Sequence, residues 1–466
     1  MKKPVNLLFM KNTSKIISSV FLLLSISILI YIYYRSIFFH EGAKSYYYYR
    51  YYIFSFILIF LSIISFFVSK KIKEYASIVL VSIIFALYCF EVHMIYKLSY
   101  EGVLNKKKEI SKNLGIKYDL RTKLEIYQDL KKKDPNIVTN FRFSSTEIKN
   151  MNLYPFSGVS NSKTIYCNEN GYYSIYQSDR YGFNNPDEEW DKNITDFLLV
   201  GDSQTHGACV NRPYDFASNL RLLKKNENGV LNLGYYGIGP LIEYAVLREY
   251  LKNKNVKNIL WMYFEGNDLL DLKIELTKPI LLKYLENKSF HQNLISKQNI
   301  IDEQNKKDIE QLVEEQKNIS HKLLSKNNII NFVKLYHVRL LIFTDKPQPE
   351  ISSGRKTTFT EILKSANELA KENNSKLYFV YLPAYERYKN TYYKSPYKKV
   401  INLVNNLKIP LINIHLNVFK NHNDPSSLFS IWGREVYPRV GSNDHYSVKG
   451  YKLISKEIYK FIKTNK

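Results

Sequence analysis

Residues 195–210 read TDFLLVGDSQTHGACV and combine a strand-like run with a sharp turn. The apolar run 197–200 has the length and composition of a buried strand. It ends at Gly201-Asp202-Ser203, where a glycine lets the chain turn sharply, and residues 204–210 can begin a helix. Ser203 is therefore predicted at the carboxyl end of a strand and beside a helix N-terminus, where open α/β sheets place their reactive groups. Taken alone, Gly-Asp-Ser is equally compatible with a polar turn.

Three further short motifs follow in the chain. Residues 232–237 read NLGYYG, the strand-like run 259–264 ends in EGND, and His445 lies in DHYSVKGY before a final amphipathic helix. With Gly-Asp-Ser, these motifs resemble the SGNH, or GDSL-type, hydrolase superfamily over roughly residues 196–463, with a long interruption. The resemblance implies a flavodoxin-like three-layer α/β/α domain with a parallel sheet.

The resemblance also implies roles for four residues. Ser203 would be the nucleophile and His445 its base, while the N–H groups of Ser203 and Gly237 and the Asn267 amide would form an oxyanion hole. The chemistry of these residue types agrees: a serine hydroxyl needs a base, histidine titrates near neutrality, and asparagine donates without titrating. The motif spacing favours Gly237 over Gly234.

The catalytic acid is not fixed by the motifs. Many relatives carry an aspartate two or three residues before the histidine, where this chain has Asn443 and Ser442. Asp444, next to His445, is the tentative acid, and Asp424 is a second candidate. The third reading is a Ser-His dyad in which a backbone carbonyl fixes the tautomer of the ring.

Other polar residues near the motifs are not assigned to the chemistry. Asp202 is expected to brace the turn and His206 to point away from the nucleophile. His415, His422 and His445 do not pair with carboxylates at ligand spacing, and no glycine-rich phosphate loop follows a strand. The sequence therefore predicts no metal and no cofactor.

The chain has three cysteines, and two of them fall near the motifs. Cys89 lies in an apolar stretch, whereas Cys167 precedes the nucleophile strand and Cys209 follows Ser203. An even pair in an exported domain can form a disulfide, which would tether the approach segment to the helix after the nucleophile. The alternative is two small buried residues.

The first hundred residues differ from the rest of the chain. Apolar stretches at 16–34, 51–69 and 75–96 each have the length of a membrane-crossing helix, although the third contains Glu91. The first is too long for a signal-peptide core and no small-residue cleavage site follows it. Tyrosines that close the first stretch and open the second resemble an aromatic belt. Residues 1–99 are therefore predicted to be a membrane anchor with three transmembrane helices.

Charge gives the expected orientation. Lysines before the first span and between the second and third favour a cytoplasmic N-terminus, while Arg35, Lys44 and Arg50 argue against it. Because the first span usually dominates, the catalytic part is expected outside the cytoplasm, in the periplasm or extracellular space. The formal net charge of +24 is spread along the chain and lacks the basic, aromatic-rich blocks of nucleic-acid modules.

The remaining chain divides into a lead-in and a hydrolase domain. Residues 100–190 are predicted to be a helical stalk followed by short strands and turns. Residues 191–466 form the hydrolase domain, interrupted at about 281–342 by a helical lid. After the lid, helices and strands alternate at 358–373, 376–382, 397–407 and 410–414, as in parallel β-α-β units.

These features predict a membrane-anchored serine esterase that acts on acyl esters outside the cytoplasm, such as an O-acylated envelope glycan. Acyl transfer and hydrolysis share one acyl-enzyme, so an O-acyltransferase is equally compatible with the motifs. A non-catalytic binding or assembly protein on the same fold is the alternative, because fold does not fix function and the acid is unassigned.

Overall fold

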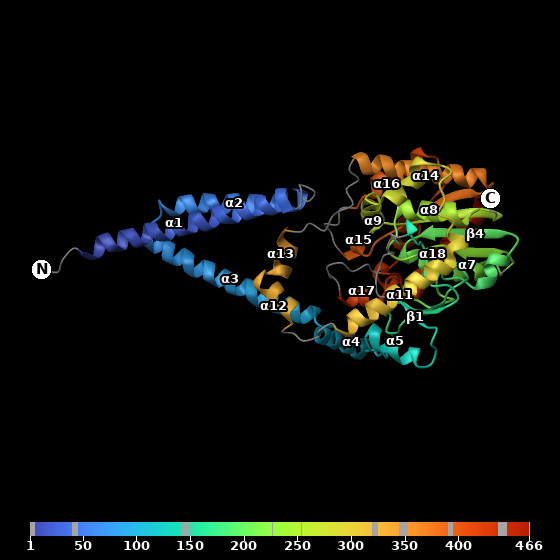
Figure 1. Ribbon diagram of the computed structural model, residues 1–466, viewed down its shortest axis with the longest axis horizontal. Helices are drawn as coiled ribbons and strands as arrows, with labels where there is room; N and C mark the ends of the chain where they lie inside the picture. Colours follow the sequence, from blue (N-terminus) through green and yellow to red (C-terminus); the bar gives the residue numbers. More distant parts are fainter. Residues whose placement is uncertain are drawn as a thin grey trace. The chain divides into compact units, whose positions relative to one another are not determined.

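The computed structural model forms two compact units (Figure 1). The anchor unit comprises Met1–Val103 and Ser320–Pro347, and the sheet unit comprises Leu104–Ile319 and Gln348–Lys466. The structure describes residues 5–39, 45–140, 148, 151–225, 227–252, 254–318, 325–343, 353–389, 395–436 and 445–465.

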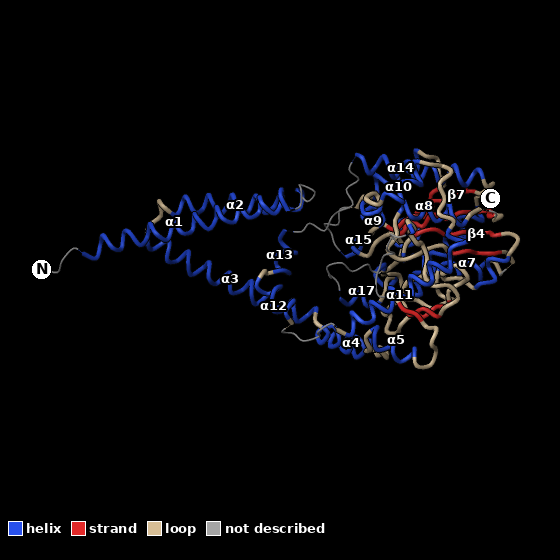
Figure 2. Tube along the Cα trace, in the orientation of Figure 1, coloured by secondary structure: helices blue, strands red, loops and turns tan. Residues whose placement is uncertain are grey.

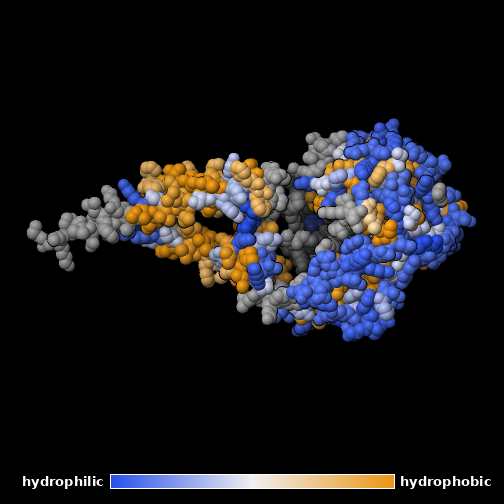
Figure 3. Space-filling view, viewed as in Figure 1, coloured by the Kyte–Doolittle hydropathy of each residue, from blue (hydrophilic) through white to orange (hydrophobic). Residues whose placement is uncertain are grey.

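Three long apolar helices make up most of the anchor unit. They are α1 (Val5–Tyr33), which continues as a π-helix to Phe39, α2 (Ser45–Ser65) and α3 (Lys70–Leu98). All three are long and apolar enough to cross a membrane. Figure 3 shows hydrophobic residues (orange) over these helices and mainly hydrophilic residues (blue) on the sheet unit. Such an exposed apolar surface suits contact with lipid.

The predicted helical lid is divided between the two units. Its first half contains α10 (Pro279–Glu286) and α11 (Gln298–Lys317), which belong to the sheet unit. Its second half contains α12 (Lys326–Val333) and α13 (Tyr336–Phe343), which belong to the anchor unit. Apolar side chains explain the division: those of α10 enter the core of the sheet unit, whereas most of those on α12 and α13 remain exposed.

A five-stranded parallel sheet forms the centre of the sheet unit, with strand order β5-β4-β6-β7-β8. In chain order this is 2-1-3-4-5, the flavodoxin-like arrangement, and it confirms the predicted fold class. The strands are β4 (Thr195–Gly201), β5 (Gly229–Asn232), β6 (Val256–Phe264), β7 (Lys376–Leu382) and β8 (Leu411–Asn413).

Helices cover both faces of this sheet (Figure 2). Every residue of β4 is buried, as expected for a parallel strand between two helical layers. Its alternate side chains enter two separate cores, Leu198 and Val200 on one face and Phe197 and Leu199 on the other. The helices of the first face are α8 (Pro240–Tyr250), α14 (Ser353–Glu372) and α16 (Tyr397–Asn406), and those of the second are α7 (Phe216–Leu223) and α18 (Val448–Thr464).

The lead-in folds against this domain. Buried Asp179 accepts hydrogen bonds from the Asn185 and Trp190 side chains, and Asn185 in turn bonds the backbone of Asn232 at the end of β5. These bonds fix the lead-in beside the strand ends that carry the motifs. Its regular elements are α4 (Tyr100–Leu114), α5 (Lys123–Lys131), β1 (Val138–Thr139), β2 (Lys163–Ile165) and β3 (Ile175–Gln177), the strands forming a small sheet.

Candidate active site

The predicted site residues follow the carboxyl ends of three adjacent strands. Ser203 comes just after β4, Gly237 follows β5, and Asn267 follows β6. The chain runs from β4 to β5 on one side and then crosses to β6 on the other, so the strand order reverses at β4. Open α/β sheets bind ligands at this switch point, because the connections leave a crevice there.

The turn that carries Ser203 depends on a glycine and a cap. A Cβ at Gly201 would clash with Thr205 Oγ1 and lie 2.8 Å from the Met262 carbonyl oxygen, so only glycine fits. Asp202 caps the short helix α6 (Ser203–His206), where its carboxylate accepts the Gln204 N–H at 2.9 Å. Ser203 is thereby held at the first position of a helix.

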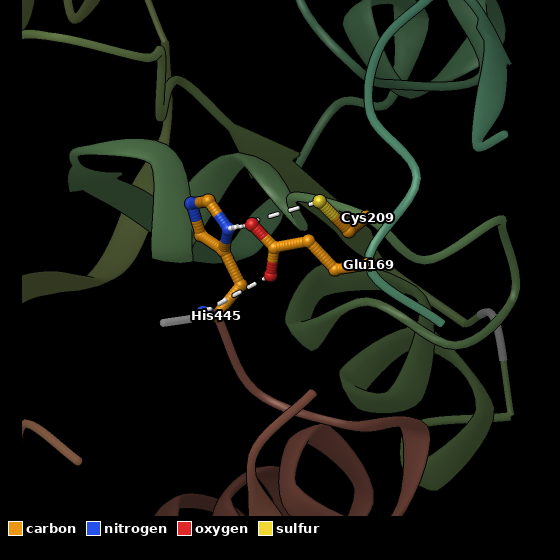
Figure 4. A group of neighbouring side chains, drawn as sticks. All are labelled: Glu169, Cys209 and His445. Carbon is orange, nitrogen blue, oxygen red and sulfur yellow. Dashed lines mark hydrogen bonds and ion pairs between the residues drawn. The ribbon is translucent and has the colours of Figure 1, made fainter. Parts of the chain in front are cut away.

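His445 lies between Ser203 and a carboxylate from the lead-in. Its Nε2 is 3.0 Å from Ser203 Oγ. Its Nδ1 is 2.9 Å from Glu169 Oε1 (Figure 4). The second carboxylate oxygen accepts the His445 backbone N–H at 3.4 Å. Because a carboxylate only accepts, Nδ1 carries the proton and Nε2 is left to accept from the serine hydroxyl. Both Ser203 and His445 are buried, with exposed fractions of 6% and 5%.

The carboxylate on the His445 ring is not one that the sequence suggested. Asp424 is exposed and its backbone N–H donates to His422, while Asp444 lies outside the described residues. The dyad reading is also corrected, since the partner of Nδ1 is a carboxylate and not a backbone carbonyl. One feature of the sequence could have pointed to Glu169: it lies two residues after Cys167. The disulfide partner of Cys167 is Cys209, which follows Ser203 closely in the chain.

Glu169 is held from both sides. Cys167 and Cys209 form a disulfide, and Asn170 Nδ2 donates to the Cys209 carbonyl at 3.1 Å. On the other side, the Trp432 N–H donates to the Glu169 carbonyl at 2.8 Å. The disulfide therefore ties the segment that carries Glu169 to the chain just after the nucleophile helix.

We expect this disulfide to support the reactivity of Ser203 through Glu169. Replacing both Cys167 and Cys209 with serine should lower the rate at which Ser203 reacts with a fluorophosphonate probe about 10-fold, because a misplaced orienting group costs roughly that much or more. In a Glu169→Gln background the same pair of substitutions should have little further effect, since the two changes act on one interaction. Cys89→Ser is the matched control. Equal losses in both backgrounds would contradict this coupling.

Two glycines compete for the oxyanion hole, and their N–H groups differ. The Gly234 N–H already donates to Asn232 Oδ1 at 2.9 Å. The Gly237 N–H has no acceptor within the described residues, and its φ of 69° suits glycine. The geometry thus favours Gly237 as a donor for a ligand.

Asn267 lies just before helix α9 (Asp268–Glu275) and is 9% exposed. Its Nδ2 donates to Asp271 Oδ2 at 2.8 Å, which uses one of the two amide hydrogens. Burial raises the pKa of Asp202, the residue before Ser203, and a hydrogen bond with the Asn267 side chain opposes this shift, so the amide lies next to the nucleophile turn.

Carboxyl groups on α9 and in the nucleophile turn have raised pKa values. Burial, with repulsion from Glu275 and Asp202, raises the pKa of Asp271 to about 8. Burial raises the pKa of Glu275 to about 7 and that of Asp202 to about 6. In the unfolded chain these pKa values are about 4. At these three carboxyl groups the folded chain therefore binds more protons between pH 4 and pH 8, so their contribution to the free energy of unfolding should fall as the pH rises through this range.

Asp271→Asn should flatten that pH dependence. Between pH 5 and pH 7 the slope of the unfolding free energy should become less negative by about 1.4 kcal/mol per pH unit, the contribution of one proton. Chemical unfolding of the detergent-solubilised chain at several pH values measures the slope. Exposed Asp424→Asn is the control and should leave it unchanged. An identical slope in Asp271→Asn and wild type would contradict the raised pKa.

His206 lies in a buried aromatic cluster. Its ring centroid is 4.7 Å from that of Tyr176 and 5.0 Å from that of Tyr166. Burial first, then the charge of His445, lowers the pKa of His206 to about 3, so its ring is neutral at physiological pH. It is a packing residue of this cluster.

One group of side chains has the proximity of a metal site but not its chemistry. Ligand atoms of Glu169, Cys209 and His445 lie within 4.8 Å of one another (Figure 4). The Cys209 sulfur is bonded to Cys167 and is not a thiolate, and the carboxylate already binds the ring nitrogen. These donors fit a polarised histidine better than a cation.

Comparison with known proteins adds little to this geometry. No family model and no curated protein matches the sequence. Among solved structures, the chain is similar to one described as a "putative lipolytic protein of G-D-S-L family" from Desulfitobacterium hafniense DCB-2. The match has 13% identity and covers 57% of this chain and 98% of that chain, and its TM-score of 0.29 is too low to support any conclusion.

Proposed function

We propose that the sheet unit is a serine esterase with a Ser203-His445-Glu169 triad. The observation that carries the proposal is the continuous chain of hydrogen bonds from Ser203 Oγ through the imidazole to Glu169, at 3.0 and 2.9 Å. A serine, a histidine and a carboxylate in this order form a nucleophile, a base and a group that orients the base. Their location at the switch point of the sheet supports the proposal, because open α/β sheets bind ligands there.

The reaction follows from these positions. Ser203 Oγ attacks the ester carbonyl carbon and its proton passes to His445 Nε2, while Glu169 stabilises the imidazolium. The N–H groups of Ser203 and Gly237 and the Asn267 amide donate to the oxyanion that forms. When the intermediate collapses, His445 returns the proton to the leaving alcohol and an acyl-Ser203 remains. Water then attacks the acyl group with the same base, or an acceptor hydroxyl does so in a transferase.

We place this reaction at a membrane and outside the cytoplasm. The three apolar helices of the anchor unit support attachment to a membrane. A disulfide between Cys167 and Cys209 supports an oxidising compartment, since such bonds are rare in the cytosol. An O-acylated envelope glycan is a substrate class that combines an ester with this location.

The reading as a non-catalytic binding protein has lost its main support. It depended on the lack of an acid, and Glu169 supplies a carboxylate on the correct ring nitrogen. A binding protein has no need for a serine hydroxyl hydrogen-bonded to an oriented base.

Labelling of the full-length protein in detergent with a fluorophosphonate probe tests the proposal. A single adduct that peptide mapping assigns to Ser203 is expected, because the probe reacts with activated serines only. A folded protein that forms no adduct, or forms one at another serine, would contradict it.

A further inference from the structure

Helices α12 and α13 belong to the anchor unit although their sequence interrupts the sheet unit. The chain enters the anchor unit near residue 320 and returns to the sheet unit near residue 348. With the connection after α3, the sheet unit is joined to the anchor by three chain connections. A loop that only connects two elements of one soluble domain would not need to enter another unit.

Glu91 binds this pair of helices to the third apolar helix. Its side chain is fully buried, and its carboxylate accepts the backbone N–H groups of His337 and Val338 at 3.0 Å. His337 Nδ1 lies 2.7 Å from the same carboxylate. A carboxylate at the first turn of a helix satisfies N–H groups that have no partner within the helix. This interaction explains the acidic residue in an otherwise apolar stretch.

Aromatic and basic residues extend the contact to α2. The Phe343 ring stacks on Tyr51 with centroids 4.2 Å apart, and Arg339 Nε donates to the Tyr51 hydroxyl at 3.2 Å. Arg50 donates to the Ile342 carbonyl at 3.1 Å. Tyrosine and arginine at the end of an apolar helix are typical of the membrane–water interface, where the ring is half in lipid and the charge reaches the headgroups.

The outer surface of the two helices is apolar. The exposed fraction is 64% for Val333, 55% for Leu341 and 50% for Ile342. These side chains continue the exposed apolar surface of α2 and α3, on which the helices pack. Isolated apolar residues on a protein surface need no explanation, but a surface continuous with membrane-crossing helices does.

We propose that α12 and α13 form a membrane-embedded hairpin whose apolar side lies in the lipid at the interface. The proposal rests on the membrane attachment proposed above and is independent of the esterase reaction. The hairpin lies against the start of α2 and the end of α3, so it occupies the membrane face from which the chain leaves α3 for the sheet unit. It would fasten the middle of the hydrolase chain to the bilayer, as amphipathic helices do.

Site-specific fluorescence in liposomes tests this placement. The full-length chain carries Cys89→Ser, because Cys89 is the free, exposed cysteine. Single cysteines replace Val333 or Leu341 and are labelled with the fluorophore NBD. Phosphatidylcholine brominated near the start of its acyl chains should quench both probes, and aqueous iodide should have little effect.

Two matched positions calibrate the result. Phe85→Cys on α3 is the lipid control, since that side chain is 70% exposed within an apolar helix. Glu314→Cys on α11 is the water control, because its side chain is 64% exposed on the sheet unit. Probes at 333 and 341 that behave like the probe at 314 would overturn the hairpin. The probe at 85 is read with lipid brominated near the ends of its acyl chains, because Phe85 lies at the middle of α3. Its failure to respond to that lipid would instead overturn the membrane attachment itself.

Discussion

Replacing Ser203 with alanine is expected to lower kcat for hydrolysis of p-nitrophenyl acetate by at least about 10⁴-fold and to abolish fluorophosphonate labelling. The substitution removes only the hydroxyl group, whose Oγ lies 3.0 Å from His445 Nε2. The oxyanion donors remain, so a small rate above that of water should persist. Steady-state kinetics of the purified full-length chain provide the measurement.

A matched serine separates this effect from a general change in the protein. Ser289 lies in an exposed turn, where its hydroxyl bonds Asn287, and Ser289→Ala should retain full activity. The thermal unfolding midpoint of Ser203→Ala should stay close to that of wild type, because the hydroxyl makes one hydrogen bond. Wild-type turnover by Ser203→Ala would end the esterase proposal.

Glu169→Gln should lower kcat by roughly 10²- to 10⁴-fold while KM changes little. The glutamine amide can donate to Nδ1, which would move the ring proton to Nε2 and leave no acceptor for the serine hydroxyl. Any remaining activity should show an acidic limb of kcat/KM at lower pH, because the imidazolium loses the charge that stabilises it. The segment should stay in place, since the Trp432 N–H bonds the Glu169 backbone and not its side chain.

Three variants distinguish Glu169 from other acids. Glu169→Asp keeps the charge and should recover part of the rate. Asp424→Asn removes an exposed carboxylate and should leave the rate unchanged, and Asp444→Asn tests the acid that the sequence suggested. A large loss in Asp444→Asn together with full activity in Glu169→Gln would reassign the acid.

The order of the motifs and the pattern of the strands determined much of the sheet unit. An apolar run that ends in Gly-Asp-Ser predicts β4 and the turn after it. The side chains on both faces of this strand are buried, and the turn has no space for a side chain at residue 201. The alternation of helix and strand predicts a parallel sheet, and short right-handed connections then allow few strand orders. These features are local or nearly local in the chain.

The carboxylate partner of His445 could not be predicted from a short segment of sequence in this way. Glu169 lies 276 residues from His445 in the sequence, in a segment without helical or strand period. Its position depends on the disulfide and on hydrogen bonds to residues near 430, which join segments that are far apart in the sequence. The aspartates at 444 and 424 were the candidates because the family resemblance places the acid shortly before the histidine.

The sequence by itself determined the fold class, the nucleophile turn and the three apolar helices, because each depends on the hydrophobic period and turn chemistry of a short segment. Tertiary structure decided which carboxylate orients His445 and which unit receives each half of the helical insertion. Tertiary structure likewise brought together Glu91 and His337, which are 246 residues apart in the sequence. A buried charge accepts whichever donors the fold brings to it, and that choice is made by packing rather than by neighbours in the chain.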